Sequence, residues 1–265
     1  MSRNKDSLQQ TVIVALLLCI VCSVIVSAAA VLLKPLQSAN KEFERSRNVL
    51  AAAGLYDASH SKEEVLNAFS AFSFKLVDLE KGNYLTGSEI NSLGIDLATF
   101  DQKKAAKTEG ISIELSGTED IAGIKRRSRY AGVYVLENNG RIEKIILPVH
   151  GYGLWSTLYG FLAVDGSGND VQGLTFYSHA ETPGLGGEVD NPSWKALWVG
   201  KKIYNANGDV ALTVIKGKAP EGHMHNVDGL SGATLTSRGV ANLIQYWMGE
   251  GGFGLYLSNV QKGEV

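Results

Sequence analysis

The sequence contains very little cysteine and proline, and neither sign of charge dominates it. Among its 265 residues there are two cysteines, five prolines, 25 basic residues and 27 acidic residues. Because Cys19 and Cys22 both lie near the N-terminus, the rest of the chain can form no disulfide of its own. The net charge of -2 gives no support for nucleic-acid binding, which requires a basic excess or stripe.

The most prominent feature that is present is one long apolar run. Residues 12–33, VIVALLLCIVCSVIVSAAAVLL, carry no charge, and at about 1.5 Å per residue a helix of this length crosses a hydrocarbon core of about 30 Å. The alternative is a cleaved signal peptide, since the alanines at 28–30 resemble a cleavage site. Signal apolar regions usually hold only about 7–15 residues, so the run predicts a retained transmembrane helix. Both cysteines lie within it, where packing explains them better than a metal or redox pair.

Charges beside the run mark its orientation only weakly. Two basic residues precede it and four follow closely, which leans toward a cytoplasmic large domain, although long domains cross membranes largely regardless of such charges. Pro35 is expected to end the membrane helix, because proline disfavours helix at the residue before it. The sequence therefore divides into a tail (1–11), a transmembrane helix (12–33), juxtamembrane helices with a mixed region (34–129) and a C-terminal domain (130–265).

Beyond the membrane run, helices flank a region rich in strands. Residues 40–58 predict an amphipathic helix, Ser61 and Glu64 predict a capping box at the start of a second helix, and residues 111–115 predict a strand. From residue 130 onward two hairpins are expected, the first turning at Asn139-Gly140 and the second at residues 166–169, with a third pairing around residues 207–208. A short helix near Pro192 and a long one from residue 234 complete the pattern. It predicts an α+β fold, with antiparallel sheets flanked by helices and preceded by one transmembrane helix.

Two glycine-containing segments are candidate sites. HGYGLWSTLYG (150–160) contains Gly-x-Gly, but a strand follows where a dinucleotide fingerprint needs a helix, and no GxxxxGK[ST] motif is present. Its Trp155 is either a core residue or a flat platform for a cofactor. HAETPGLGGE (179–188) is a tight, backbone-exposing loop that is either an ordinary turn or a functional one. His223 and His225 lack further metal ligands and fit surface histidines better than a metal site.

A third segment, DGLSGATLTSRG (228–239), opens the last long helix and offers four hydroxyl groups where one cap would suffice. Ser231 occupies the expected N-cap position, and the helix start behind it is a suitable site for a phosphate. Small residues at Gly232 and Ala233 let an approaching group reach the Thr234 hydroxyl. A plain helix start remains the alternative, because short Ser/Gly/Thr strings are common.

DGLSGAT (228–234) resembles the flavinylation signal Asp-x-x-(Ser/Thr)-Gly-Ala-Thr, whose final threonine carries FMN through a phosphoester bond. GYGLWSTLYGFL, HAETPGLGGE and the single membrane helix also resemble the family of C subunits of the sodium-translocating NADH:quinone oxidoreductases. The related G subunit of the Rnf electron-transport complex shares the domain and the signal. The segment GLWSTLYGFL and the chain length favour a C subunit of the sodium pump over the Rnf subunit.

The resemblance implies a role for each motif. Thr234 is the residue that a separate, magnesium-dependent flavin transferase esterifies from FAD, because a threonine hydroxyl alone is a weak nucleophile. The resemblance assigns the other residues to two sets and one single position. The transferase recognises, and the phosphate contacts, Asp228, Ser231, Gly232 and Ala233. The isoalloxazine pocket is lined by Trp155, Ser156, Glu181, Thr182 and Leu185, and Lys216 lies near the phosphate or the flavin.

The resulting expectation is a membrane-anchored electron carrier, a subunit of an NADH:quinone oxidoreductase that pumps sodium ions. It is expected in the bacterial inner membrane beside the other subunits, in contact with lipid and with its large domain in the periplasm. The alternatives are the Rnf subunit, a membrane-tethered binding module without redox activity, and a hydrolase using Ser231 or Thr234. The hydrolase lacks a well-placed base, since only the loosely positioned His225 is near in sequence.

Overall fold

The structure is a computed structural model that describes residues 8–265. Residues 1–7 of the expected tail lie outside the described residues. The chain divides into two compact units, Met1–Arg45 and Ser46–Val265. The expected division at residues 129–130 stays a prediction.

Helix α1 (Leu8–Ala52) contains the apolar run and is long and apolar enough to cross a membrane, with a mean hydropathy of 3.0 over its most apolar window. The prediction that Pro35 ends this helix is wrong, because the helix continues through it. Proline removes one backbone hydrogen bond, while helix-forming leucine, lysine, glutamine and glutamate residues on both sides sustain the others. Residues 40–52 of the helix expected at 40–58 are therefore the last part of α1, and residues 53–58 lie beyond its end. Cys19 and Cys22 are free and exposed along it.

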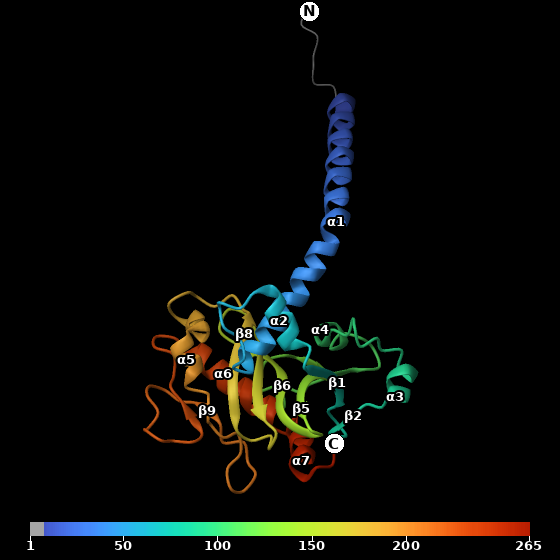
Figure 1. Cartoon of the computed structure of the whole chain (residues 1–265). Helices are drawn as coiled ribbons and strands as arrows, with labels where there is room; N and C mark the ends of the chain where they lie inside the picture. Colours follow the sequence, from blue (N-terminus) through green and yellow to red (C-terminus); the bar gives the residue numbers. More distant parts are fainter. Residues whose placement is uncertain (1–7) are drawn as a thin grey trace, which may run out of the picture. The chain divides into compact units, whose positions relative to one another are not determined.

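The second unit is organised around one antiparallel sheet with the strand order β2-β1-β5-β6-β7-β8 (Figure 1). Both expected hairpins are confirmed, and Asn139 and Gly140 turn the first with φ values of 51° and 73°. The sequence does not predict strand β1, because its partner β5 lies more than fifty residues further along the chain and no local turn announces the pairing. The strands are β1 (Phe72–Asp78), β2 (Asn83–Tyr84), β5 (Tyr130–Asn138), β6 (Arg141–Tyr152), β7 (Thr157–Asp165) and β8 (Val171–Ser178).

Helix α6 (Thr234–Met248) packs across the sheet and completes the core (Figure 1). Its predicted apolar face is confirmed, since Val240, Leu243, Ile244 and Trp247 are all fully buried. The Trp247 indole N–H donates to the carbonyl of His150 at 2.6 Å, which joins the helix to β6. Helix α7 (Gly254–Lys262) follows it.

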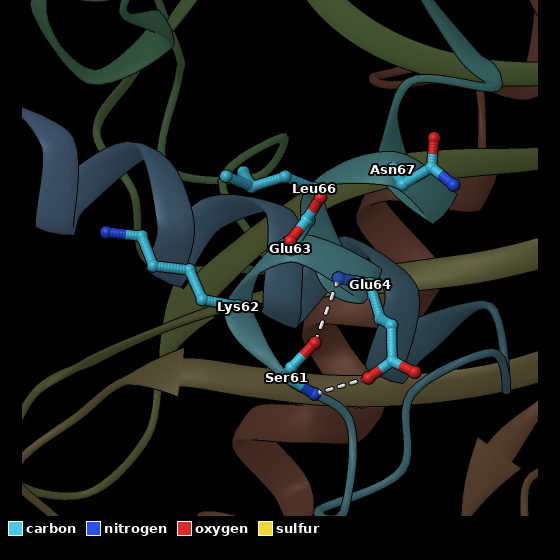
Figure 2. A pocket seen from close by; sticks show the side chains of 6 residues that line it. All are labelled: Ser61, Lys62, Glu63, Glu64, Leu66 and Asn67. Carbon is cyan, nitrogen blue, oxygen red and sulfur yellow. Dashed lines mark hydrogen bonds between the residues drawn. The ribbon is translucent and has the colours of Figure 1, made fainter.

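Shorter elements surround this core. The capping box predicted at Ser61 and Glu64 is confirmed at the start of α2 (Lys62–Phe69), beside a shallow surface hollow (Figure 2). The third expected pairing is reduced to one bridge between Tyr204 and Val210. The remaining elements are α3 (Gly87–Ser92), α4 (Gln102–Ala105), β3 (Ser112–Glu114), β4 (Arg126–Ser128), the 3-10 helix η1 (Gly186–Asp190), α5 (Pro192–Ala196), β9 (Thr213–Val214) and β10 (Asn226–Val227), the last two pairing in parallel.

The contact between Trp247 and the sheet gives a stability prediction. Trp247→Phe removes the indole donor and leaves a cavity and an unpaired carbonyl, so we expect a loss of about 2–3 kcal/mol and a melting temperature lower by about 5–10 °C. Thermal unfolding of the full chain in detergent micelles, followed by near-ultraviolet circular dichroism, measures it. Trp155→Phe is the matched control, because that ring is exposed; equal melting temperatures for the two variants would contradict the prediction.

Candidate functional site

The carboxylate of Glu181 lies where the three sequence motifs meet. It follows β8 and is only 5% exposed. Its Oε1 atom accepts hydrogen bonds from the backbone N–H groups of Leu154, Trp155 and Ser156 at 3.1, 2.9 and 3.2 Å. One side chain of the HAETPGLGGE loop therefore holds the backbone of the GYGLWS segment.

The same carboxylate also holds the first turn of α6. The Thr236 hydroxyl, itself buried, donates to Oε2 of Glu181 at 2.7 Å. Sequence reasoning did not identify Thr236, although the excess of hydroxyl groups at the helix start was the signal for it. The buried Ser237 has a second internal role, since its hydroxyl accepts the N–H of Leu230 at 2.9 Å.

Glycines make this close approach of three segments sterically feasible. A Cβ atom at Gly153 or Gly186 would lie 2.7 or 2.8 Å from a carboxylate oxygen of Glu181. A Cβ atom at Gly239 would lie 2.5 Å from the carbonyl oxygen of Tyr152. Real Cβ atoms do not approach other atoms this closely, so each of these positions requires glycine for packing.

Opposing effects act on the pKa of Glu181. Burial alone raises it, because desolvation disfavours the charged form. The hydrogen bonds from the Thr236 hydroxyl and from the backbone of residues 154–156 favour the charged form and outweigh burial, and they hold the pKa of Glu181 below its ordinary value of 4.5. The side chain is therefore a carboxylate near neutral pH.

Each of the three segments that meet at Glu181 also has an apolar side chain exposed to solvent. Trp155 is 66% exposed, Leu185 44% and Leu235 52%. A Cβ atom at Gly232 would lie 3.0 Å from Cδ2 of Leu185, so this leucine contacts the Ser-Gly-Ala-Thr segment. The alternative that Trp155 is a core residue is thereby excluded.

The start of α6 differs from the expected cap. Ser231 is not the N-cap, because Ala233 occupies that position and makes no side-chain hydrogen bond. Gly232 has a φ of 72°, which takes the chain out of helical geometry and delays the helix by two residues. The first N–H groups of a helix have no intrahelical partner, and here no side chain of the cap satisfies them. Thr234 is the exposed first residue of this helix.

The other expected site residues take varied positions. Asp228 is half-buried and structural, since Oδ1 accepts the Ala219 N–H and its carbonyl accepts the Trp194 indole N–H, both at 2.8 Å. The Ser156 hydroxyl accepts the N–H of Ala180 at 2.7 Å. Thr182 is exposed on the HAETPGLGGE loop. Lys216 is exposed on a different segment, which is joined to the signal by a hydrogen bond from the Gly229 N–H to the Gly217 carbonyl.

The chemistry of these residues suits FMN. The uncapped helix start offers backbone N–H donors and the positive end of the helix dipole to a phosphate. Thr234 supplies an exposed hydroxyl, and the apolar side chains of Trp155, Leu185 and Leu235 offer a surface to a flat ring system. Among residues 8–265 no cluster of histidine, cysteine, aspartate or glutamate could hold a metal ion.

The buried carboxylate gives a pH-dependent stability prediction. A group whose folded pKa is depressed contributes stability above its unfolded pKa and loses that contribution as pH falls through the folded value. We therefore expect Glu181→Gln to destabilise the chain by about 1–3 kcal/mol at about pH 7, and the difference to narrow below the ordinary value of 4.5. Urea unfolding at about pH 7 and about pH 3.5 measures it; an equal destabilisation at both would contradict the pH dependence.

Comparison with known proteins identifies the family. The FMN-binding domain family matches residues 153–249, which contain the second and third motifs and all but the first three residues of the first. The C subunit of the Na(+)-translocating NADH-quinone reductase from Pseudomonas aeruginosa is 51% identical over 99% of both chains. The corresponding C subunit from Vibrio alginolyticus is 45% identical over the full length of both.

Solved structures agree with this assignment. The crystal structure of Shewanella oneidensis NqrC is 33% identical, covers 84% of this chain and 99% of its own, and has a TM-score of 0.75. The C subunit from Parabacteroides distasonis is 27% identical, covers 86% and 96% respectively, and has a TM-score of 0.61. With full-length identities of 45–51% and the same fold, the chain belongs to the family of C subunits of the Na(+)-translocating NADH-quinone reductases, which are oxidoreductase complexes.

Proposed function

We propose that the chain carries FMN on a phosphoester bond to Thr234 and passes electrons within a redox-driven sodium pump. The observation that carries this proposal is the position of Thr234. It ends a complete DGLSGAT signal and is exposed at the first position of α6. Thr236 and Ser237, the next hydroxyl residues, are buried and engaged in hydrogen bonds.

A separate flavin transferase with magnesium attaches the flavin. The bond formed joins Oγ1 of Thr234 to the phosphorus of the FMN moiety of FAD, and AMP leaves with the electrons of the broken phosphoanhydride bond. The threonine proton passes to a base of the transferase, because a threonine hydroxyl needs an external base to become a nucleophile. Ser231, Gly232 and Ala233 form the recognition segment, and Asp228 holds it to the Ala219 backbone.

The chain's own residues hold and orient the bound flavin. Trp155 and Leu185 offer apolar contacts, Ser156 and Thr182 supply polar groups beside them, and Lys216 supplies a positive charge for the phosphate. Glu181 holds the backbone of the Trp155 segment from below. When bound, the isoalloxazine ring supplies the electron-transfer chemistry, while the protein provides attachment, orientation and electrostatics.

Helix α1 anchors the flavin domain to the bacterial inner membrane beside the other subunits of the complex. We assign the domain to residues 130–265 and place it on the periplasmic side. The ion path belongs to the assembled complex, because residues 12–33 contain no ionisable side chain except two cysteines. Covalent attachment suits a carrier, since a flavin that dissociated between redox states would interrupt electron flow.

Attachment at Thr234 is directly testable. In cells that also make the flavin transferase, we expect the peptide containing Thr234 to gain the mass of FMN less one water, measured by mass spectrometry. Thr234→Val removes the acceptor oxygen at nearly constant volume and abolishes in-gel flavin fluorescence. Thr118→Val is the matched control, because it makes the same substitution at an exposed threonine outside the signal and leaves the acceptor in place. A fluorescent Thr234→Val protein would show that the acceptor is elsewhere.

The periplasmic position predicts a labelling pattern. With Cys19 and Cys22 replaced by alanine, a Gly263→Cys variant should react with a membrane-impermeant maleimide in intact spheroplasts. A Ser2→Cys variant should react only after lysis, because it lies before the membrane helix. The reverse pattern would place the domain in the cytoplasm, as the charge count around the helix favours.

A further inference from the structure

Glu181 carries a buried negative charge that no cation neutralises. Its hydrogen-bond donors are the backbone N–H groups of residues 154–156 and the hydroxyl groups of Ser156 and Thr236, all of which are neutral. Within residues 8–265 no lysine, arginine or histidine forms an ion pair with it. A buried charge is usually paired, so an unpaired one at this position requires an explanation.

The histidine that contacts the backbone of Glu181 pairs with a different carboxylate. Nδ1 of His179 accepts the backbone N–H of Glu181 at 3.2 Å, so this ring nitrogen presents a lone pair toward Glu181. Nε2 of the same ring lies 2.9 Å from Oδ2 of Asp190. The His179 side chain therefore makes no ion pair with the carboxylate of Glu181.

The position of the charge determines what it acts on. It lies between the backbone that carries the exposed Trp155 and the first turn of α6, which begins at Thr234. These are the two segments that, in the proposed function, hold the ring and the phosphate of the flavin. Water screens an exposed charge strongly but screens a buried one much less.

We propose that Glu181 sets the reduction potential of the flavin on Thr234, its buried charge favouring the oxidised form. This inference rests on the proposed function. Each electron taken up adds a negative charge to the flavin unless a proton follows, and a fixed negative charge nearby opposes that change. At an effective dielectric constant of about 20, one unit charge within about 10 Å changes such an equilibrium by about tenfold.

The test compares wild type with Glu181→Gln as flavinylated full-length chains in detergent micelles. Glutamine has nearly the same shape, its amide oxygen can accept the backbone N–H groups, and the Thr236 hydroxyl can turn to accept from its amide. The charge is removed while the main hydrogen-bond partners stay in place, although their bonds to a neutral amide are weaker than those to a carboxylate. In a spectroelectrochemical titration we expect a higher midpoint potential, with the ratio of oxidised to reduced flavin falling about three- to tenfold at a fixed potential. Equal midpoints would overturn the proposal.

Three further variants separate charge from structure. Thr236→Val and Glu181→Asp disturb the hydrogen bonds but keep the carboxylate, so their midpoints should stay near that of wild type. Glu188→Gln removes a half-buried charge of the same loop that is hydrogen-bonded to the Asn191 amide, and it should cause a much smaller rise than Glu181→Gln. A rise in Thr236→Val or Glu181→Asp equal to that of Glu181→Gln would overturn the charge-based account.

The outcomes also distinguish this inference from the proposed function. A wild-type chain without flavin on Thr234 contradicts the proposed function itself. A flavinylated wild type and a flavinylated Glu181→Gln with the same midpoint contradict only the role of Glu181. If Glu181→Gln does not fold, Glu181→Met carries the test, because it also removes the charge at nearly constant volume: a raised midpoint supports the proposal, and a wild-type midpoint overturns it.

Discussion

The burial of one carboxylate constrains the whole site. Glu181 accepts hydrogen bonds from three backbone N–H groups and two hydroxyl groups of two segments, and it leaves no room for a Cβ atom at Gly153 or Gly186. A carboxylate buried without these donors is strongly unfavourable, so none of the segments can move away without exposing or stranding it. The surface that carries Trp155, Leu185 and Thr234 is thereby built as one piece on the end of the sheet.

The sequence predicts those parts of the fold that depend on neighbours along the chain. Both hairpins, the capping box at Ser61 and the apolar face of α6 follow from local turn residues and periodicity, and all are confirmed. Strand β1 is not predicted from the sequence, because its pairing with β5 joins residues that are far apart along the chain. Pro35 does not end α1, since a single proline costs one hydrogen bond and a long helix retains the rest.

The candidate site likewise has features that the sequence predicts and features that depend on tertiary contacts. The motif places Thr234 correctly at a helix start. The sequence also favours Ser231 as the N-cap, and only the positive φ of Gly232 in the structure shows that it is not. The resemblance places Glu181 at the isoalloxazine pocket, which stays a prediction, and the structure adds that its carboxylate is buried and accepts backbone hydrogen bonds. Its role depends on Thr236, which is distant in sequence and carries no motif of its own. Such roles become visible only when the tertiary contacts are known.

Gly232 has a consequence for how the signal changes over evolution. Its φ of 72° and its contact with Leu185 require glycine for folding alone, whether or not a flavin is attached. Thr234 is exposed at the end of a helix, and folding makes no comparable demand on it. Under the proposed attachment, a lineage that lost its transferase would retain the glycine while the threonine changed, so the glycine and threonine together, and not Ser-Gly-Ala alone, would mark a chain that carries its cofactor covalently.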